Sequence, residues 1–260
     1  MFGIIPKPLW DKQVTPDDLN RISMVTRSLL LVSEKRKILV DTGNGTKWEE
    51  KYKNIYNINT DRYSIEKSLG KYQFSAEDIT DVICTHLHFD HIGGNTKLES
   101  GKVVPTFPNA KYWMTKENWK LANHPSQKDA GSFMEQDWKV LAENQMIEIV
   151  DGKESFIDGV ETYLTYGHTP GLLHPIISDG SKKLFYGADI FPMVAHIPIA
   201  WVMAYDVQPV LTIEEKQRLL PQMEHEEWIL FFEHDPFVQA CTVQQDGKHF
   251  KMKDKVSISD

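Results

Sequence analysis

The chain has 260 residues, which is enough for one large domain or two small ones with a sizeable buried core. Its composition, 41% hydrophobic and 25% charged, is that of a globular protein and excludes a disordered or fibrous chain. The formal net charge of −8 argues against nucleic-acid binding as a main function, because such binding needs Lys and Arg to neutralise phosphates.

Cysteine content and the first residues bear on the cellular compartment. Cys84 and Cys241 are too few for a disulfide scaffold or a cysteine-rich zinc module, and two reduced thiols fit a cytosolic protein better than one disulfide. The opening MFGIIPKPLW lacks the basic and apolar regions of a signal peptide, and no run of residues reaches transmembrane length. We therefore expect a cytoplasmic protein without a membrane partner.

Short apolar runs between turn residues predict strands along the whole chain. In chain order they fall at 28–33, 37–43, 81–86, 110–115, 146–150, 160–167, 174–178, 183–189, 228–235 and 237–243. Helices are expected at 132–144 and at 212–226, the second beginning with a capping box formed by Thr212 and Glu215.

Many short strands with fewer helices, in two comparable halves, predict an α/β or α+β protein with mainly mixed sheets and helices outside. No Pro-, Gly- or Ser-rich linker separates the halves, so we expect a single domain over residues 1–260. Residues 44–76, rich in Tyr, Asn and Lys, are expected to form a surface excursion that serves as a lid or as a dimer contact.

The segment THLHFDHIGG, residues 85–94, concentrates metal-ligand side chains directly after a predicted buried strand. Residues two apart on an extended backbone project to the same side, so His86 and His88 can reach one metal ion. Asp90 and His91 come after the chain turns and can face a second point nearby. This spacing suits a pair of metals better than a single ion, whereas a solvated histidine-rich loop is the alternative.

Two glycines follow the ligand-type residues. Gly93 and Gly94 are expected to let the backbone turn sharply and approach the site closely. Three later segments supply further ligand candidates at the ends of predicted strands: His168 in YGHTPG, Asp189 in LFYGAD and His234 in ILFFEHD. Taken singly, each of these is more typical of a structural histidine or a helix cap.

The ordered set THLHFDH, GHTPG, YGAD and FEHD, preceded by ILVDTG, resembles the metallo-β-lactamase superfamily of metallohydrolases over residues 22–243. The resemblance implies a metallo-β-lactamase fold, a four-layer αββα sandwich of two mixed β-sheets flanked by helices, with the site at one edge. It also implies a site for two divalent metal ions, most suitably zinc, with manganese, iron or cobalt compatible with the same ligands.

Each ligand is implied by its motif. The first ion would be held by His86, His88 and His168, the second by Asp90, His91 and His234, with Asp189 bridging both. Asp41 would fix the loop that presents the ligands. Such a pair shares a bridging hydroxide as nucleophile, and Asp90 would orient it and carry its proton to the leaving group.

The segment YGADIFPMVAHIPIAWVMAYDVQP, residues 186–209, resembles the branch that holds methyl-parathion hydrolase and quorum-quenching N-acyl-homoserine lactonases. The implied substrate is a small lactone, ester or phosphotriester, with a lactone favoured. Many lactonases have a Tyr shortly after the bridging Asp, but Phe191 here cannot donate a hydrogen bond. His174 is expected to be structural or to support a ligand, and His196 to be a buried structural residue or a pocket wall.

Two alternatives stay open at this point. A thioester hydrolase of the glyoxalase II type shares the first motif, but it would carry a basic helical module at its C-terminal end, and this chain ends in predicted strands. A metal-binding protein without hydrolase activity would not require the whole ligand set. A homodimer is compatible with the sequence.

Overall fold

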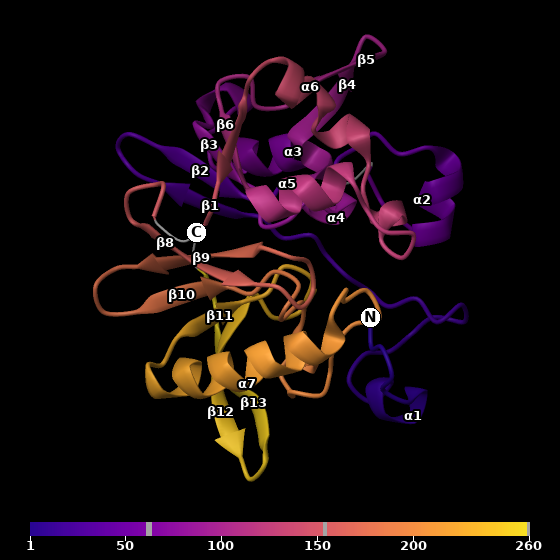
Figure 1. Ribbon diagram of the computed structural model, residues 1–260, viewed down its shortest axis with the longest axis vertical. Coiled ribbons are helices and arrows are strands. Elements are labelled where there is room, and N and C mark those ends of the chain that lie inside the picture. The colour runs from indigo at the N-terminus through magenta and orange to yellow at the C-terminus, as the bar shows by residue number, and fades with distance from the viewer. Residues whose placement is uncertain (61–63, 153–154, 259–260) are drawn as a thin grey trace. The chain divides into compact units, whose positions relative to one another are not determined.

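A computed structural model of the chain describes residues 1–60, 64–152 and 155–258, and it divides into two compact units (Figure 1). The central unit is Thr26–Asp151, and the terminal unit joins Met1–Val25 to Gly152–Asp260. Each unit is built on its own mixed sheet, which confirms the predicted α/β class with mixed sheets and helices. The single domain expected over residues 1–260 stays a prediction.

The central unit contains a five-stranded sheet in the order β1-β2-β3-β6-β7. Its strands are β1 (Leu29–Val32), β2 (Lys37–Val40), β3 (Asp81–Ile83), β6 (Lys111–Thr115) and β7 (Ile147–Val150). β1 is antiparallel to β2, and the other neighbours are parallel. Because β2 and β3 run parallel, the residues that follow them, Asp41 and the loop from Cys84, leave the sheet at the same edge.

Short elements surround this sheet, and sequence reasoning missed most of them. They are α2 (Glu50–Tyr56), α3 (Ile65–Lys71), α4 (Phe89–Ile92), α5 (Lys116–Asn123), α6 (Lys139–Glu143), the hairpin β4 (Thr96–Glu99) and β5 (Lys102–Pro105), and the 3₁₀ turns η1 (Ala76–Asp78), η2 (Gly93–Asn95), η3 (Ala130–Ser132) and η4 (Glu135–Asp137). The excursion expected at 44–76 carries α2 and α3, while its residues 61–63 lie outside the described residues.

The single helix predicted over 132–144 is wrong, because this segment contains the end of η3, then η4 and α6. Tertiary contacts hold the irregular backbone between them. The Gln136 carbonyl accepts a hydrogen bond from the Thr96 hydroxyl, and the Asp137 carboxylate pairs with Lys47. Each contact uses a polar group at a position that the apolar spacing alone assigns to a helix.

The terminal unit contains a six-stranded sheet in the order β13-β12-β11-β10-β9-β8. Its strands are β8 (Val160–Thr165), β9 (Leu172–Ser178), β10 (Lys183–Tyr186), β11 (Ile229–Phe231), β12 (Ala240–Asp246) and β13 (His249–Val256). β9 is antiparallel to both β8 and β10, and β10 is parallel to β11, so β8, β10 and β11 point the same way. The loops carrying His168, Asp189 and His234 therefore all start at one edge of this sheet.

Helix α7 (Pro209–His225) packs on the terminal sheet through Leu219, Leu220 and Met223, and Figure 1 shows it in orange alongside β11 to β13. The predicted start at Thr212 is wrong. The helix begins at Pro209, whose fixed φ suits a first helical position, and Glu215 uses its carboxylate outside the helix. The remaining elements are α1 (Lys7–Trp10) and η5 (Val194–His196).

Each unit buries one of the two cysteines, and both thiols are free. Burial raises the pKa of Cys84 and of Cys241 to about 12, so neither is a thiolate nucleophile at neutral pH. Among the described residues, no helix combines the length and the apolar character needed to cross a bilayer.

Candidate metal centre

Five of the predicted site residues of the central unit lie together after β2 and β3. His86 follows β3, and His88, on extended backbone, immediately precedes the short helix α4, whose first turn carries Asp90 and His91. His86 Nε2 lies 3.0 Å from His88 Nδ1, and His91 Nε2 lies 3.9 Å from a carboxylate oxygen of Asp90. The loop therefore gathers nitrogen and oxygen ligand atoms within a few ångströms of one another.

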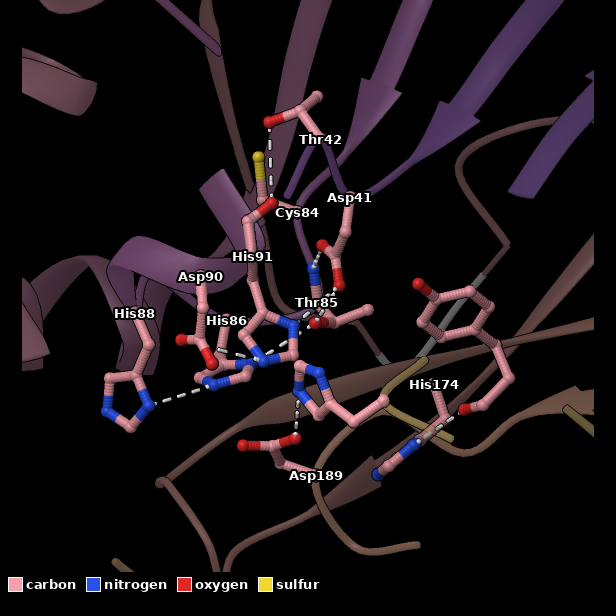
Figure 2. A network of polar contacts seen from close by, with 12 residues as sticks. Asp41, Thr42, Cys84, Thr85, His86, His88, Asp90, His91, His174 and Asp189 are labelled. Atoms are coloured by element: carbon pink, nitrogen blue, oxygen red, sulfur yellow. Dashed lines mark hydrogen bonds and ion pairs between the residues drawn. The ribbon is translucent and has the colours of Figure 1, made fainter. Parts of the chain in front are cut away.

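Asp41 contacts both Thr85 and His91 in this group, as Figure 2 shows. Its carboxylate accepts hydrogen bonds from the Thr85 backbone N–H at 2.8 Å and from the Thr85 hydroxyl at 2.6 Å. The same carboxylate accepts a bond from His91 Nδ1 at 3.0 Å, and the Thr85 oxygen lies 3.1 Å from His86 Nδ1. With Nδ1 of both rings bonded to oxygen, Nε2 is the nitrogen that each ring keeps for a metal.

Gly93 and Gly94 follow the ligand-type residues and begin the turn η2. Neither glycine has a positive φ, so the turn itself does not require glycine. What requires glycine is a close approach to the backbone of residues 42–44. A Cβ on Gly93 would lie 2.3 Å from the Asn44 carbonyl oxygen, and one on Gly94 would lie 2.3 Å from the Thr42 carbonyl oxygen.

Gly94→Ala is therefore expected to destabilise the protein by about 3 kcal/mol, because the added methyl overlaps a backbone oxygen that cannot rotate away. Gly70→Ala, in α3, is the matched control: no atom lies within 4 Å of its Cβ position, so it should stabilise by about 0.5–1 kcal/mol. Urea unfolding measures both changes. Equal effects of the two substitutions would show that the Thr42 backbone yields freely.

The terminal unit brings its three predicted ligands together around one carboxylate. His168 Nε2 lies 3.1 Å from one oxygen of Asp189, and His234 Nε2 lies 3.0 Å from the other. His168 Nδ1 donates to Asp206 at 2.9 Å, and His234 Nδ1 donates to the Val25 carbonyl at 2.9 Å. Both rings thus turn Nε2 toward Asp189.

These donor sets fit a transition-metal site. Four candidate imidazoles, those of His86, His91, His168 and His234, have Nδ1 held by a protein oxygen, the arrangement that metal-bound histidines almost always show. Two ligands on one tetrahedral zinc, each about 2.0–2.1 Å from it, lie roughly 3.3 Å apart. The separations of 3.0 and 3.1 Å in both units are close to that value.

Sequence reasoning missed Asp206. It lies in the loop before α7, in the segment AYDVQP, and no neighbouring residue type marks it as a partner of a histidine 38 positions earlier. Its side chain is buried, as is that of His168. A general rule offered the only signal: a ligand histidine needs an acceptor for its other nitrogen.

The three pocket candidates of the terminal unit lie in packed surroundings. His174 lies between the Thr165 hydroxyl at 2.8 Å and the Tyr186 carbonyl at 3.0 Å, and its ring stacks on Phe185. Phe191 is fully buried in the core beside α7. His196 stacks on Phe2, and its Nε2 donates to the Met1 carbonyl at 3.1 Å. The contacts described give all three side chains a packing role.

The buried His174 is expected to make the protein less stable in acid. Burial lowers its pKa to about 4 from an ordinary 6.5, so the folded protein binds fewer protons than the unfolded chain between these values. Its stabilising contribution is therefore complete above pH 6.5 and is lost as the pH falls toward 4, by about 3 kcal/mol in all.

Unfolding free energies of the wild type and of His174→Gln, measured between pH 4.5 and 8, should converge as the pH falls. Burial also lowers the pKa of His196, and burial raises that of Asp137, but the difference between the two proteins cancels these shared contributions. Parallel curves would contradict the assignment of this acid sensitivity to His174.

Comparison with known proteins gives one family and several relatives. The family model described as the Metallo-beta-lactamase superfamily matches residues 24–234. N-acyl homoserine lactonase AiiA of Bacillus thuringiensis subsp. kurstaki is 27% identical over 223 residues, which cover 79% of each chain.

Solved structures share the fold. A probable metal-dependent hydrolase from Staphylococcus aureus is 27% identical, with a TM-score of 0.87 over 99% of this chain and 92% of that one. AidC, a dizinc quorum-quenching lactonase in complex with a product, is 24% identical, with a TM-score of 0.73 over 91% of this chain and 81% of that one. The second likeness is one of fold alone.

Proposed function

The chain belongs to the metallo-β-lactamase superfamily and is a metal-dependent hydrolase, and we propose that it opens the ring of a lactone, N-acyl-homoserine lactones being favoured, with two divalent ions. The lactonase relatives and the segment 186–209 support this substrate class. Zinc suits the imidazole and carboxylate ligands best. The cytoplasmic location, the single domain and the homodimer belong to the proposal as expectations.

One observation carries the proposal of two ions. Each oxygen of the Asp189 carboxylate faces a different imidazole, His168 on one side and His234 on the other, which is the arrangement expected of a ligand shared between two metals. In the order of the family motifs, we assign one ion to His86, His88 and His168, and the other to Asp90, His91 and His234.

When bound, the two ions supply a water of lowered pKa as nucleophile and a Lewis acid for the substrate carbonyl. The chain itself supplies the proton carrier. The Asp90 side chain is 27% exposed, whereas that of its neighbour His91 is fully buried, so Asp90 is the one of the two that a substrate can reach.

We assign to Asp90 the transfer of a proton from the attacking water to the ring oxygen. Addition of the water oxygen to the carbonyl carbon is followed by cleavage of the bond between that carbon and the ring oxygen. The ring oxygen leaves with the proton as a hydroxyl group. The product hydroxy acid ionises at neutral pH, so each turnover releases one proton to the solution.

This proton release gives the test. Zinc- and manganese-loaded protein is assayed in a pH-stat against acyl-homoserine lactones of several chain lengths, simple γ- and δ-lactones, aryl esters, an acyl thioester and a phosphotriester. A clear preference for lactones supports the proposal. Turnover confined to aryl or phosphate esters, or to the thioester, would reject the substrate class. No turnover by fully metal-loaded protein would favour a metal-binding role without catalysis.

A further inference from the structure

We propose that Asp206 is a positioning residue that orients His168 and sets the affinity of the metal ion that His168 binds, with Glu215 holding the backbone of the same loop. This inference rests on the metal centre of the proposed function but not on its substrate. Asp206 lies in the loop before α7 and Glu215 within the helix, both far from the ligand motifs in the sequence.

The contact between Asp206 and His168 is buried and directional. One carboxylate oxygen accepts the hydrogen bond from His168 Nδ1 at 2.9 Å, and the other accepts the Met203 backbone N–H at 3.2 Å. The side chains of His168 and Asp206 are each about 1% exposed. The Met203 bond fixes one oxygen of the planar carboxylate and thereby fixes the other. The hydrogen bond from Nδ1 to this second oxygen then sets the orientation of the imidazole ring.

The same segment binds the backbone of the histidine loop. The Val207 N–H donates to the His168 carbonyl at 3.0 Å, and the Gln208 N–H donates to the Gly167 carbonyl at 2.8 Å. The Glu215 carboxylate accepts the N–H groups of Tyr166 at 2.6 Å and Gly167 at 3.1 Å.

Close packing also holds the histidine loop against α7. A Cβ on Gly167 would lie 2.3 Å from the Thr212 hydroxyl oxygen, so glycine is required for this approach. The first turns of α7 and the loop before it therefore fix the position of residues 166–168, through hydrogen bonds to their backbone and to the His168 ring.

Asp206 has a counterpart in the central unit. The Asp41 carboxylate accepts the bond from His91 Nδ1 at 3.0 Å, as the Asp206 carboxylate does from His168. A carboxylate at Nδ1 keeps the proton there, leaves the Nε2 lone pair for the metal and raises its basicity. In the proposed assignment, each ion thus has one imidazole supported by a carboxylate, and the two supports are separate residues.

The separation of the two supports is directly testable. In competition titrations with a chromophoric chelator, Asp206→Asn should bind one of two zinc ions 10–100-fold more weakly and the other with unchanged affinity. Asp41→Asn should weaken chiefly the other ion, through His91, with a smaller effect on the first through Thr85 and His86. Cobalt-loaded Asp206→Asn should also show a changed d–d absorption spectrum, because the ligand geometry at one ion changes. Asp158→Asn, an exposed Asp outside both ligand groups, is the control for the substitution itself.

Glu215→Gln gives a second, milder variant if Asp206→Asn folds poorly. It keeps one acceptor oxygen for the loop, so a smaller loss at the same ion is expected. Unchanged affinities and spectra in both variants, or an equal loss at both ions, would overturn the inference. Wild-type protein that binds two ions but opens no lactone would reject the substrate and leave this inference intact, whereas wild-type protein that binds no ion would overturn both.

Discussion

Asp90→Asn is expected to lower kcat/KM for lactone opening by roughly 10²–10⁴-fold while the protein keeps its metal ions. The amide retains an oxygen that can contact a metal, but it cannot accept and pass on a proton at neutral pH. Asn has nearly the same shape as Asp, and the Asp90 side chain is 27% exposed, so the exchange should leave the fold unchanged.

Metal content by elemental analysis and rates in the pH-stat assay measure the two effects separately. Glu99→Gln, at an exposed position at the end of β4, is the matched control for loss of a carboxylate and should leave both measurements unchanged. A variant that loses one metal together with activity would show that Asp90 acts only as a ligand. A variant with both metals and near-normal rates would move the proton transfer to another group.

Sequence reasoning located the candidate ligands because their signals are local. His86 and His88 are two residues apart in the loop after β3, and His168, Asp189 and His234 each follow a strand within three residues. Each strand is recognised in the sequence as a short apolar run, so the ligand-type residues directly after that run are recognised with it. The direction of those strands, which places three loops at one edge, required the structure.

The residues that sequence reasoning missed act over long separations. Glu215 looked like the partner of Thr212 in a capping box, but its carboxylate binds N–H groups 48 and 49 residues earlier. Asp206 and Lys47 are single charged residues outside any ligand-type motif, and a solvated side chain is the usual case for such residues. Nothing in spacing or composition shows that such a charge is buried, because burial depends on which distant backbone arrives beside it.

Replacement of Lys47 is expected to cause the largest loss of stability. Its ammonium group, only 3% exposed, pairs with Asp137 at 3.1 Å and donates to the carbonyl oxygens of Gly93 and Thr96. Lys47→Met leaves a buried carboxylate and two carbonyls without this donor. Removal of one partner from a buried ion pair typically costs about 3–5 kcal/mol, and we expect a loss in unfolding free energy of that size.

The pH dependence identifies the cause of that loss. Burial raises the pKa of Asp137 to about 6 even with Lys47 present, and the loss of the positive charge should raise it further. A carboxyl with a raised folded pKa binds its proton more tightly in the folded state, so its contribution to stability falls as the pH rises above 3.8. The deficit of Lys47→Met should therefore be larger at pH 8 than at pH 5, and adding Asp137→Asn should recover much of it.

Lys97→Met is the control, because its pair with Glu66 is part-exposed and such pairs contribute at most about 1 kcal/mol. A deficit independent of pH would show that the lost carbonyl bonds, rather than the unpaired carboxylate, destabilise the variant. Lys47 also connects the buried ion pair to the ligand loop, because the Gly93 carbonyl that it binds lies two residues after His91. Lys47→Met should therefore weaken metal binding along with stability. If stability falls and metal affinity does not, the ligand loop is held by its contacts with the Thr42 backbone, and the ion pair serves the fold alone.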